Sequence, residues 1–216
     1  GEIAVRRQAG AGRERSGTYR RGELVDDGPG RTVAAYGALR EIVRRGHRLT
    51  RRIEEFGKPV IVAVNGLGYG GGCEITEAAP LAIAADHATF AKPEITLGFP
   101  PPFGGSRRLP RHVGRKRALE MILTGDPIPA TRAAELGLVN TVVPADDLRD
   151  AAHELATRIT RHAPTAVAAC LRAVIRGVNL PIDEGLAVEA ACFAATVPTE
   201  GVRAGLRQFL DRVPNA

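Results

Sequence analysis

The chain lacks most of the features that mark a nucleic-acid-binding, membrane-spanning or disulfide-stabilised protein. It has no tryptophan and only 4% aromatic residues, so side chains on which bases stack are scarce. No apolar run approaches the roughly eighteen residues that cross a bilayer, and residues 1–7 lack the apolar segment of a signal peptide. The three cysteines are widely spaced and odd in number, which fits a reducing compartment and neither a disulfide framework nor a CxxC metal site. We therefore expect a cytoplasmic protein that binds neither membranes nor nucleic acid.

Lysine is also scarce, and arginine carries almost all of the positive charge. The formal net charge is +6, which is compatible with a nucleic-acid surface, a site for a polyphosphorylated ligand such as coenzyme A, or an arginine-rich solvated surface. The densest arginine groups, at 44–45 and 51–52, fall on a segment with helical periodicity, and the others are spread along the chain. This distribution favours a solvated surface.

What is present is the composition of an ordinary globular protein, with 44% hydrophobic and 25% charged residues among 216. Residues 1–32 are rich in glycine and arginine and predict an irregular segment. From Val33, apolar residues recur at steps of three and four as far as Phe56, which predicts an amphipathic helix. Gly57 and Pro59 follow and would end that helix.

Two short, uniformly apolar runs, 59–65 and 81–85, are typical of strands buried on both faces of a parallel sheet. We expect a short helix between them, over 71–79, and a further short element around residues 90–95. The later pattern predicts one helix over 109–123, another over 130–136, a strand over 140–143, and helices over 146–162, 164–176, 183–195 and 199–212. Strand–turn–helix units followed by helices indicate an α/β core with a helical C-terminal region.

The glycine-rich turn after the first strand has two interpretations. Gly66, Gly68 and Gly71 match the dinucleotide-binding fingerprint. Asp86 ends the next strand, where the acid that binds ribose belongs in that fingerprint.

Glu74 argues against a bound pyrophosphate. It lies in the first turn of the following helix, where its carboxylate would offset the attraction of the helix N-terminus for phosphate. The same placement suits chemistry on a thioester, because the N–H groups of Gly71 and Gly72 can point at a carbonyl oxygen while Glu74 faces the adjacent carbons. Glycine is needed there because a Cβ would push the substrate away.

A series of further motifs gives the turn its context, and with them the chain resembles the enoyl-CoA hydratase (crotonase) family. The resemblance runs from Lys58 to about Arg212, with the motifs in the family's order. They are 58–66, 70–74, 85–98, 104–111, 123–125, 133–140 and 143–144. Such a series is far harder to reach by chance than a single GxGxxG.

The resemblance implies an α/β fold of the crotonase (ClpP-like) type, a ββα spiral core with a C-terminal α-helical oligomerisation region. We divide the chain into an irregular or divergent N-terminal segment (1–32), the α/β core (33–145) and the C-terminal helical region (146–216). Members of the family use the last region to form trimers, often paired into hexamers. A homotrimer or a hexamer is therefore expected.

Glu74 and Glu94 fall on the positions of the two catalytic glutamates of the family's hydratases. Relatives with other chemistries often keep one or neither, so the pair implies reversible addition of water to a trans-2-enoyl-CoA. Two carboxylates can hold one water, one accepting its proton and the other orienting it or supplying a proton. Gly71 would stand in the oxyanion hole that polarises the thioester carbonyl. The substrate is carried as a coenzyme A thioester, and no permanently bound cofactor or metal is required.

Other positions implied by the resemblance surround this centre. Gly70 and Gly72 flank Gly71 and are expected to contact the substrate. Phe99 and Phe103 are expected to border the acyl pocket.

The expected second oxyanion donor is Ala11, with Ala9 and Gly10 at the coenzyme A. This Ala-Gly-Ala stretch lacks the Asp-Leu that follows it in the family, and its composition also fits a flexible linker. Arg212 matches a basic residue that can reach coenzyme A, often in a neighbouring subunit.

Several alternatives stay open. Within the family they are another acyl-CoA reaction, by a double-bond isomerase or a lyase, and a truncated inactive member. Outside it they are a dinucleotide-dependent dehydrogenase and a basic binding protein. The five histidines show no ligand spacing, and Cys73 is interpreted as a small packed residue, because no histidine or asparagine partner is evident.

Overall fold

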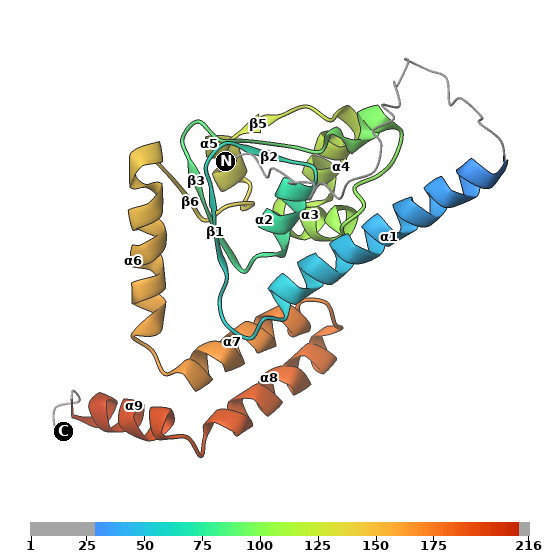
Figure 1. The fold of residues 1–216 in the computed structure, drawn as a ribbon. Coiled ribbons are helices and arrows are strands. Elements are labelled where there is room, and N and C mark those ends of the chain that lie inside the picture. Colours follow the sequence, from blue (N-terminus) through green and yellow to red (C-terminus); the bar gives the residue numbers. More distant parts are fainter. Residues whose placement is uncertain (1–28, 212–216) are drawn as a thin grey trace, which may run out of the picture.

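The structure is a computed structural model that describes residues 29–211 (Figure 1). The core comprises α1 (Pro29–Glu54), β1 (Ile61–Val64), β2 (Leu67–Tyr69), α2 (Gly71–Ala78), β3 (Leu81–Ala85), β4 (Thr89–Ala91), the 3-10 helix η1 (Pro93–Leu97), α3 (Gly105–Val113), α4 (Arg115–Thr124), β5 (Ile128–Pro129), α5 (Ala130–Glu135) and β6 (Thr141–Val143). The C-terminal part comprises the 3-10 helix η2 (Ala145–Asp147), α6 (Leu148–Thr160), α7 (Pro164–Gly177), α8 (Ile182–Thr196) and α9 (Glu200–Leu210).

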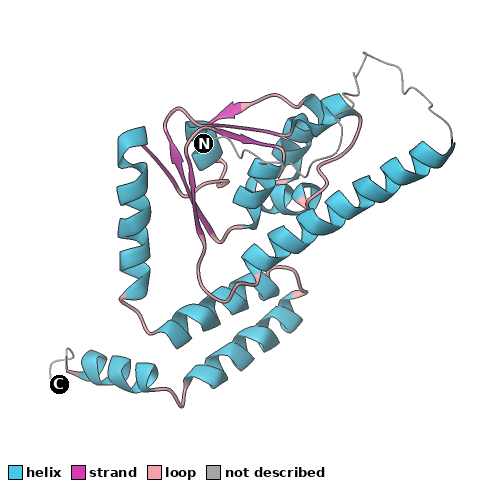
Figure 2. Cartoon of the chain, viewed as in Figure 1, coloured by secondary structure: helices cyan, strands magenta, loops and turns pink. Residues whose placement is uncertain are grey.

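The strands form two small sheets, in the orders β1-β3-β6 and β2-β4-β5. The first is parallel throughout, whereas in the second β2 pairs with β4 in parallel and β4 with β5 antiparallel. The chain passes from β1 to β2 through Gly66, whose φ of +144° is a conformation that favours glycine. Figure 2 shows the strands of both sheets with helices around them.

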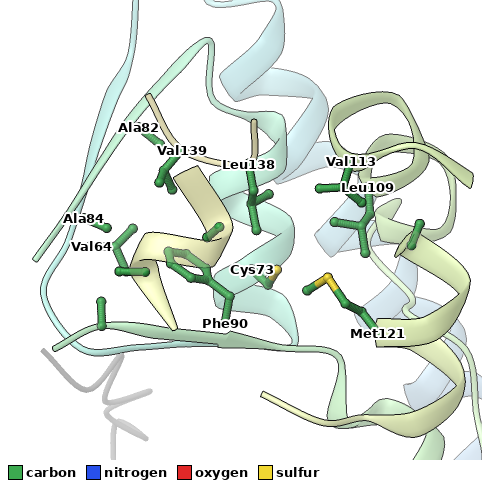
Figure 3. Packing of buried hydrophobic residues seen from close by; sticks show 14 residues of the cluster. Val64, Cys73, Ala82, Ala84, Phe90, Leu109, Val113, Met121, Leu138 and Val139 are labelled. Atoms are coloured by element: carbon green, nitrogen blue, oxygen red, sulfur yellow. The ribbon is translucent and has the colours of Figure 1, made fainter. Parts of the chain in front are cut away.

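β3 is the central strand of the first sheet, and its alternating side chains supply two apolar clusters. Ala82 and Ala84 belong to the main cluster, which includes residues of α2 to α5 and of the second sheet. Ile83 and Ala85 belong to a smaller cluster against α6 on the other face. Because successive strand residues point to opposite faces, one strand supports both layers. Figure 3 shows the main cluster around Phe90.

The two predicted core strands are confirmed, but only β3 is buried on both faces. In β1, Val64 is buried and Ala63 is exposed. The reason is position: β1 pairs with β3 on one side, and among residues 29–211 no strand pairs with its other side. The prediction of full burial was therefore wrong for β1.

Two other predictions are corrected at glycine and proline positions. The single helix predicted over 109–123 is two helices, α3 and α4, because Gly114 between them has φ of +79° and breaks the helical path. The predicted irregular segment is too long, because α1 already begins at Pro29, and proline is well tolerated at a helix start.

The C-terminal helices α6 to α9 match the prediction closely. α7 and α8 lie side by side in Figure 1, and their glycines allow a close approach, since a Cβ on Gly185 would lie 3.2 Å from the Gly177 carbonyl oxygen. Within α7, α8 and α9 only Cys192 is buried. None of the helices in the described part of the chain is long and apolar enough to cross a membrane.

We predict that Phe90→Ala lowers the free energy of unfolding by about 3–5 kcal/mol, because it removes a fully buried ring and leaves a cavity. Leu123→Ala is the matched control. That side chain is 63% exposed, so its truncation should change the free energy by less than about 0.5 kcal/mol. Chemical denaturation followed by circular dichroism measures both. Equal losses would contradict the placement of Phe90 at the centre of the core.

Candidate active site

The site is built around the start of α2, where glycines bring the backbone close to two other segments. Gly70 precedes the helix with φ of +53°, and its N–H donates to the carbonyl oxygen of Ala91 in β4 at 3.0 Å. A Cβ on Gly70 would lie 3.4 Å from Glu94 Oε1, and one on Gly71 would lie 3.1 Å from the Phe103 ring. Gly70 is required by its left-handed backbone and Gly71 by the ring above it.

Glu74 lies in the first turn of α2 and is completely buried. Its Oε1 accepts hydrogen bonds from the backbone N–H groups of Phe103, at 2.8 Å, and Gly105, at 2.7 Å. Its Oε2 is buried and has no hydrogen-bond partner among residues 29–211. One oxygen therefore fixes the carboxylate, and the other can accept a proton.

Glu94 lies in η1 and is also buried, with 6% of its surface exposed. Both of its carboxylate oxygens lack a hydrogen-bond partner within the described chain. When it is ionised, Glu94 raises the pKa of Glu74, so the two carboxylates interact. Three buried carboxylate oxygens without partners in one place are unusual in a native protein and call for a functional explanation.

The pKa of Glu74 is raised above its ordinary value, chiefly because burial disfavours the charged form. The N–H of Gly105, the positive charge of Lys92 and the N–H of Phe103 oppose that shift, in this order, and Glu94 adds to it. The ionised and the protonated forms of Glu74 are therefore closer in free energy than those of an exposed glutamate, which suits proton transfer near neutral pH.

The loop that binds Glu74 is itself held by α1. The carbonyl oxygen of Phe103 accepts hydrogen bonds from Thr50 Oγ1, at 2.9 Å, and Arg108 Nη1, at 3.1 Å. Arg108 also makes a two-pronged ion pair with Glu54, at 2.8 and 2.5 Å. The position of the Glu74 carboxylate therefore depends on α1 and α3 as well as on α2.

The sequence did not reveal a second set of buried polar groups behind Glu74. Lys92 is fully buried and forms an ion pair with Glu77, and Cys73 Sγ lies 3.4 Å from the same Glu77 oxygen. In the sequence each of these charges looks like a surface residue. The only available signal was the position of Glu77 one helical turn after Glu74, on the face that carries the buried Cys73.

The structure brings most of the predicted site residues together. Gly70, Gly71, Glu74, Glu94 and Phe103 meet at the start of α2, and Gly72 is the next residue of that helix. Cys73 is confirmed as a packed residue, and burial raises the pKa of its thiol well above the ordinary value.

Among the other predicted positions, the structure describes Phe99. The Phe99 N–H donates to the Glu94 carbonyl oxygen at 3.3 Å, while its side chain is exposed. Its contact with an acyl chain stays a prediction. Ala9, Gly10, Ala11 and Arg212 lie outside the described residues.

Neither a metal site nor the cleft beside α1 coincides with the glutamate pair. Over the described ranges no group of three or more histidine, cysteine, aspartate or glutamate side chains is arranged to hold a metal ion. A cleft with a volume of about 820 Å³ lies between α1, α3 and α7 and is lined by Arg51, Arg107 and Arg111 among others. The carboxylates of Glu74 and Glu94 do not border it.

Comparisons with known proteins agree with the geometry. A family model described as enoyl-CoA hydratase/isomerase matches residues 33–215. The chain is 41% identical over 167 residues to a short-chain-enoyl-CoA hydratase of Clostridium acetobutylicum, covering 77% of this chain and 64% of that protein. It is 39% identical to a crotonyl-CoA hydratase of Syntrophomonas wolfei, covering 80% of this chain and 66% of that protein. The chain thus spans just under two thirds of the length of these relatives.

Solved structures give the same result for the fold. An enoyl-CoA hydratase from Bacillus anthracis superposes with a TM-score of 0.79 at 35% identity, covering 82% of this chain and 68% of that one. An enoyl-CoA hydratase/isomerase from Cupriavidus metallidurans superposes with a TM-score of 0.78 at 32% identity, covering 88% and 69%. The predicted crotonase-type α/β fold with a C-terminal helical region is confirmed.

We predict that Arg108→Met lowers the free energy of unfolding by about 2 kcal/mol, because it leaves the partly buried Glu54 without its partner and removes one of the two donors to the Phe103 carbonyl oxygen. Arg132→Met is the control. It breaks the more exposed ion pair with Glu135, which should cost less than about 1 kcal/mol. Urea denaturation compares the two variants with the wild type. If Arg132→Met lowered the free energy of unfolding as much as Arg108→Met, the role of Arg108 in holding the loop would be contradicted.

Proposed function

Because this chain belongs to the enoyl-CoA hydratase/isomerase family, we propose that it reversibly adds water to a trans-2-enoyl-CoA, giving a 3-hydroxyacyl-CoA. The observation that carries this proposal is the buried pair of Glu74 and Glu94, whose oxygens include three without a partner in the described chain. Such oxygens can accept hydrogen bonds from a reacting water. The pair lies beside the N-terminus of α2, which favours negative charge nearby.

Glu74 is the base in this proposal. Both N–H bonds to its Oε1 stabilise the charged form, and Oε2 is left to take the proton of the water. Glu94 receives no such donor among residues 29–211. Its role is to orient the water and to supply the proton to C2.

The steps balance without an additional reagent. The cycle starts with Glu74 ionised and Glu94 protonated. The oxygen of the water bonds to C3, one proton passes to Glu74, and the proton of Glu94 bonds to C2. Transfer of the proton from Glu74 to Glu94 then restores the starting state. The electrons of the double bond move through the thioester toward its carbonyl oxygen. The N–H of Gly71 at the start of α2 would stabilise the negative charge on that oxygen, and one such donor is typically worth about 2.7–4 kcal/mol in the transition state. This chemistry needs no permanently bound cofactor.

The remaining substrate contacts belong to the same proposal. Ala11 would supply the second oxyanion donor, and Ala9 and Gly10 would contact the coenzyme A. Gly70 and Gly72 let the thioester approach the helix closely, and Phe99 and Phe103 would border the acyl group.

We further propose that the chain assembles through its C-terminal helices into a trimer or a pair of trimers. Support comes from the large apolar side chains that α8 and α9 expose, which is typical of a subunit interface. They are Ile182, Leu186, Phe193, Leu206, Phe209 and Leu210. The coenzyme A contact of Arg212 would then come from a neighbouring subunit.

The first test uses crotonyl-CoA and follows the loss of the conjugated enoyl thioester by its absorbance. We expect hydration by the wild type and a fall in kcat of about 10²- to 10⁴-fold for Glu74→Gln and for Glu94→Gln, because each removes a proton-transfer group. Glu135→Gln, at an exposed position, is the control and should keep wild-type activity.

Two results would overturn the proposal. Activity that survives both substitutions excludes the glutamate pair as the catalytic groups. Conversion of a 3-enoyl-CoA without hydration of crotonyl-CoA assigns the chain to the isomerases of the family instead.

The second test measures the assembled mass by size-exclusion chromatography with light scattering. We expect three or six times the 22.9 kDa of one chain. The double variant Phe193→Asp/Phe209→Asp should elute as a monomer, because it places charges in the apolar contact. Glu189→Gln, at an exposed polar position of α8, is the control. A monomeric wild type contradicts this part of the proposal.

A further inference from the structure

Behind Glu74 lies a cluster of buried ionisable groups for which the hydration chemistry has no direct use. Lys92 follows β4 and has no exposed surface, and it forms an ion pair with the equally buried side chain of Glu77 on α2. Neither Lys92 nor Glu77 is among the residues to which the proposed hydration assigns a role.

Gly105 shows how close this cluster comes to the catalytic carboxylate. A Cβ on Gly105 would lie 2.6 Å from Lys92 Nζ and 2.9 Å from Glu74 Oε1. The ammonium and the carboxylate oxygen therefore face the same small space, which exists only because residue 105 has no side chain. They do not form a direct ion pair within the described chain, so Lys92 acts on Glu74 through its charge.

The ammonium is a stable cation. Burial alone would lower the pKa of Lys92, but the acidic groups Cys73, Glu77 and Glu74 outweigh that effect and raise it above its ordinary value. The pKa of Glu77 is raised to about 7 by burial, against the opposing charge and hydrogen bond of Lys92.

A buried ion pair of this kind contributes little to the stability of the fold. Taking two charges out of water is expensive, and replacing a buried pair by apolar residues of similar size is often neutral or stabilising. Placed next to a buried base, however, a fixed positive charge has a definite effect, because it favours the ionised state of that base.

We propose that Lys92 is a positioning residue for the hydration reaction: held in place by Glu77, its ammonium keeps the buried Glu74 carboxylate ionised and able to accept the proton of the reacting water. This inference rests on the proposed function.

Other ionisable groups also face this region and are the same in every variant compared below. From α2 there is Cys73, from η1 Glu94, and from α3 Arg108 and His112, whose Nε2 hydrogen-bonds to the Glu77 carbonyl oxygen. α1 contributes Glu54 through Arg108.

The decisive experiment measures the pKa of Glu74 directly, by NMR titration of protein labelled with ¹³C at the glutamate carboxyls. The Glu74 signal is identified by its loss in Glu74→Gln. Two variants are compared with the wild type, Lys92→Met and the double variant Lys92→Met/Glu77→Gln. Both remove the ammonium, and the double variant also replaces Glu77 by a neutral side chain of similar size.

Both variants should raise the pKa of Glu74. Without the ammonium it rises by about one unit or more, since a neighbouring opposite charge lowers a carboxyl pKa by about 1–3 units. The acid limb of kcat/KM against pH should shift upward by the same amount. Arg132→Met/Glu135→Gln, which removes an exposed pair, should leave both unchanged.

A purely structural ion pair would change the unfolding midpoint but not the Glu74 titration, and an unchanged pKa of Glu74 in either variant overturns the inference. If the double variant fails to fold, the upward shift in Lys92→Met alone still decides. If the wild type does not hydrate crotonyl-CoA, the proposed function fails, while the NMR titration continues to test the electrostatic role of Lys92.

Discussion

The two backbone hydrogen bonds to Glu74 Oε1 are the constraint on which the site depends. They join the first turn of α2 to the loop at Phe103 and Gly105, which precedes α3. The same loop is tied to α1 through Thr50 and Arg108. A carboxylate in the core thus links three helices that are far apart in the sequence. If it moved, the loop would lose its anchor, and the ring that covers Gly71 would move with it.

Several buried charged groups surround this constraint at the centre of the protein. Glu74, Glu77, Lys92 and Glu94 are all buried, although such groups are rarely found inside proteins unless paired. The apolar groups of β3 and the helices provide the stability that these charges cost. The pattern is that of a functional centre, because perturbed ionisable groups collect where proton transfer is required.

The parts of this arrangement that are local in sequence were predictable, and those created by contacts between distant segments were not. The start of α2 and the placement of Glu74 and Glu94 followed from motifs a few residues long. The short strand β2 was missed, because its Leu-Gly-Tyr sequence reads as a turn and its pairing depends on β4, about twenty residues away. Lys92 and Glu77 were missed for the same reason, since each charge resembles a surface residue until the fold places the two together. The backbone donors of the loop leave no mark in the side-chain pattern.

The glycine motif itself shows how the fold separates two functions that the sequence leaves open. In a dinucleotide-binding fold the first strand leads directly into the helix that holds the pyrophosphate. Here β2 intervenes and pairs with β4 in the second sheet. Gly66, with φ of +144°, lets the chain pass from the first sheet to the second. Gly68 makes room for the Phe90 ring, because a Cβ on Gly68 would lie 2.7 Å from that ring. Asp86 is 62% exposed and accepts a hydrogen bond from the neighbouring His87 N–H. Each glycine of the fingerprint therefore has a structural reason of its own: Gly66 the change of sheet, Gly68 the Phe90 ring, and Gly71, at the start of the helix that carries Glu74, the Phe103 ring.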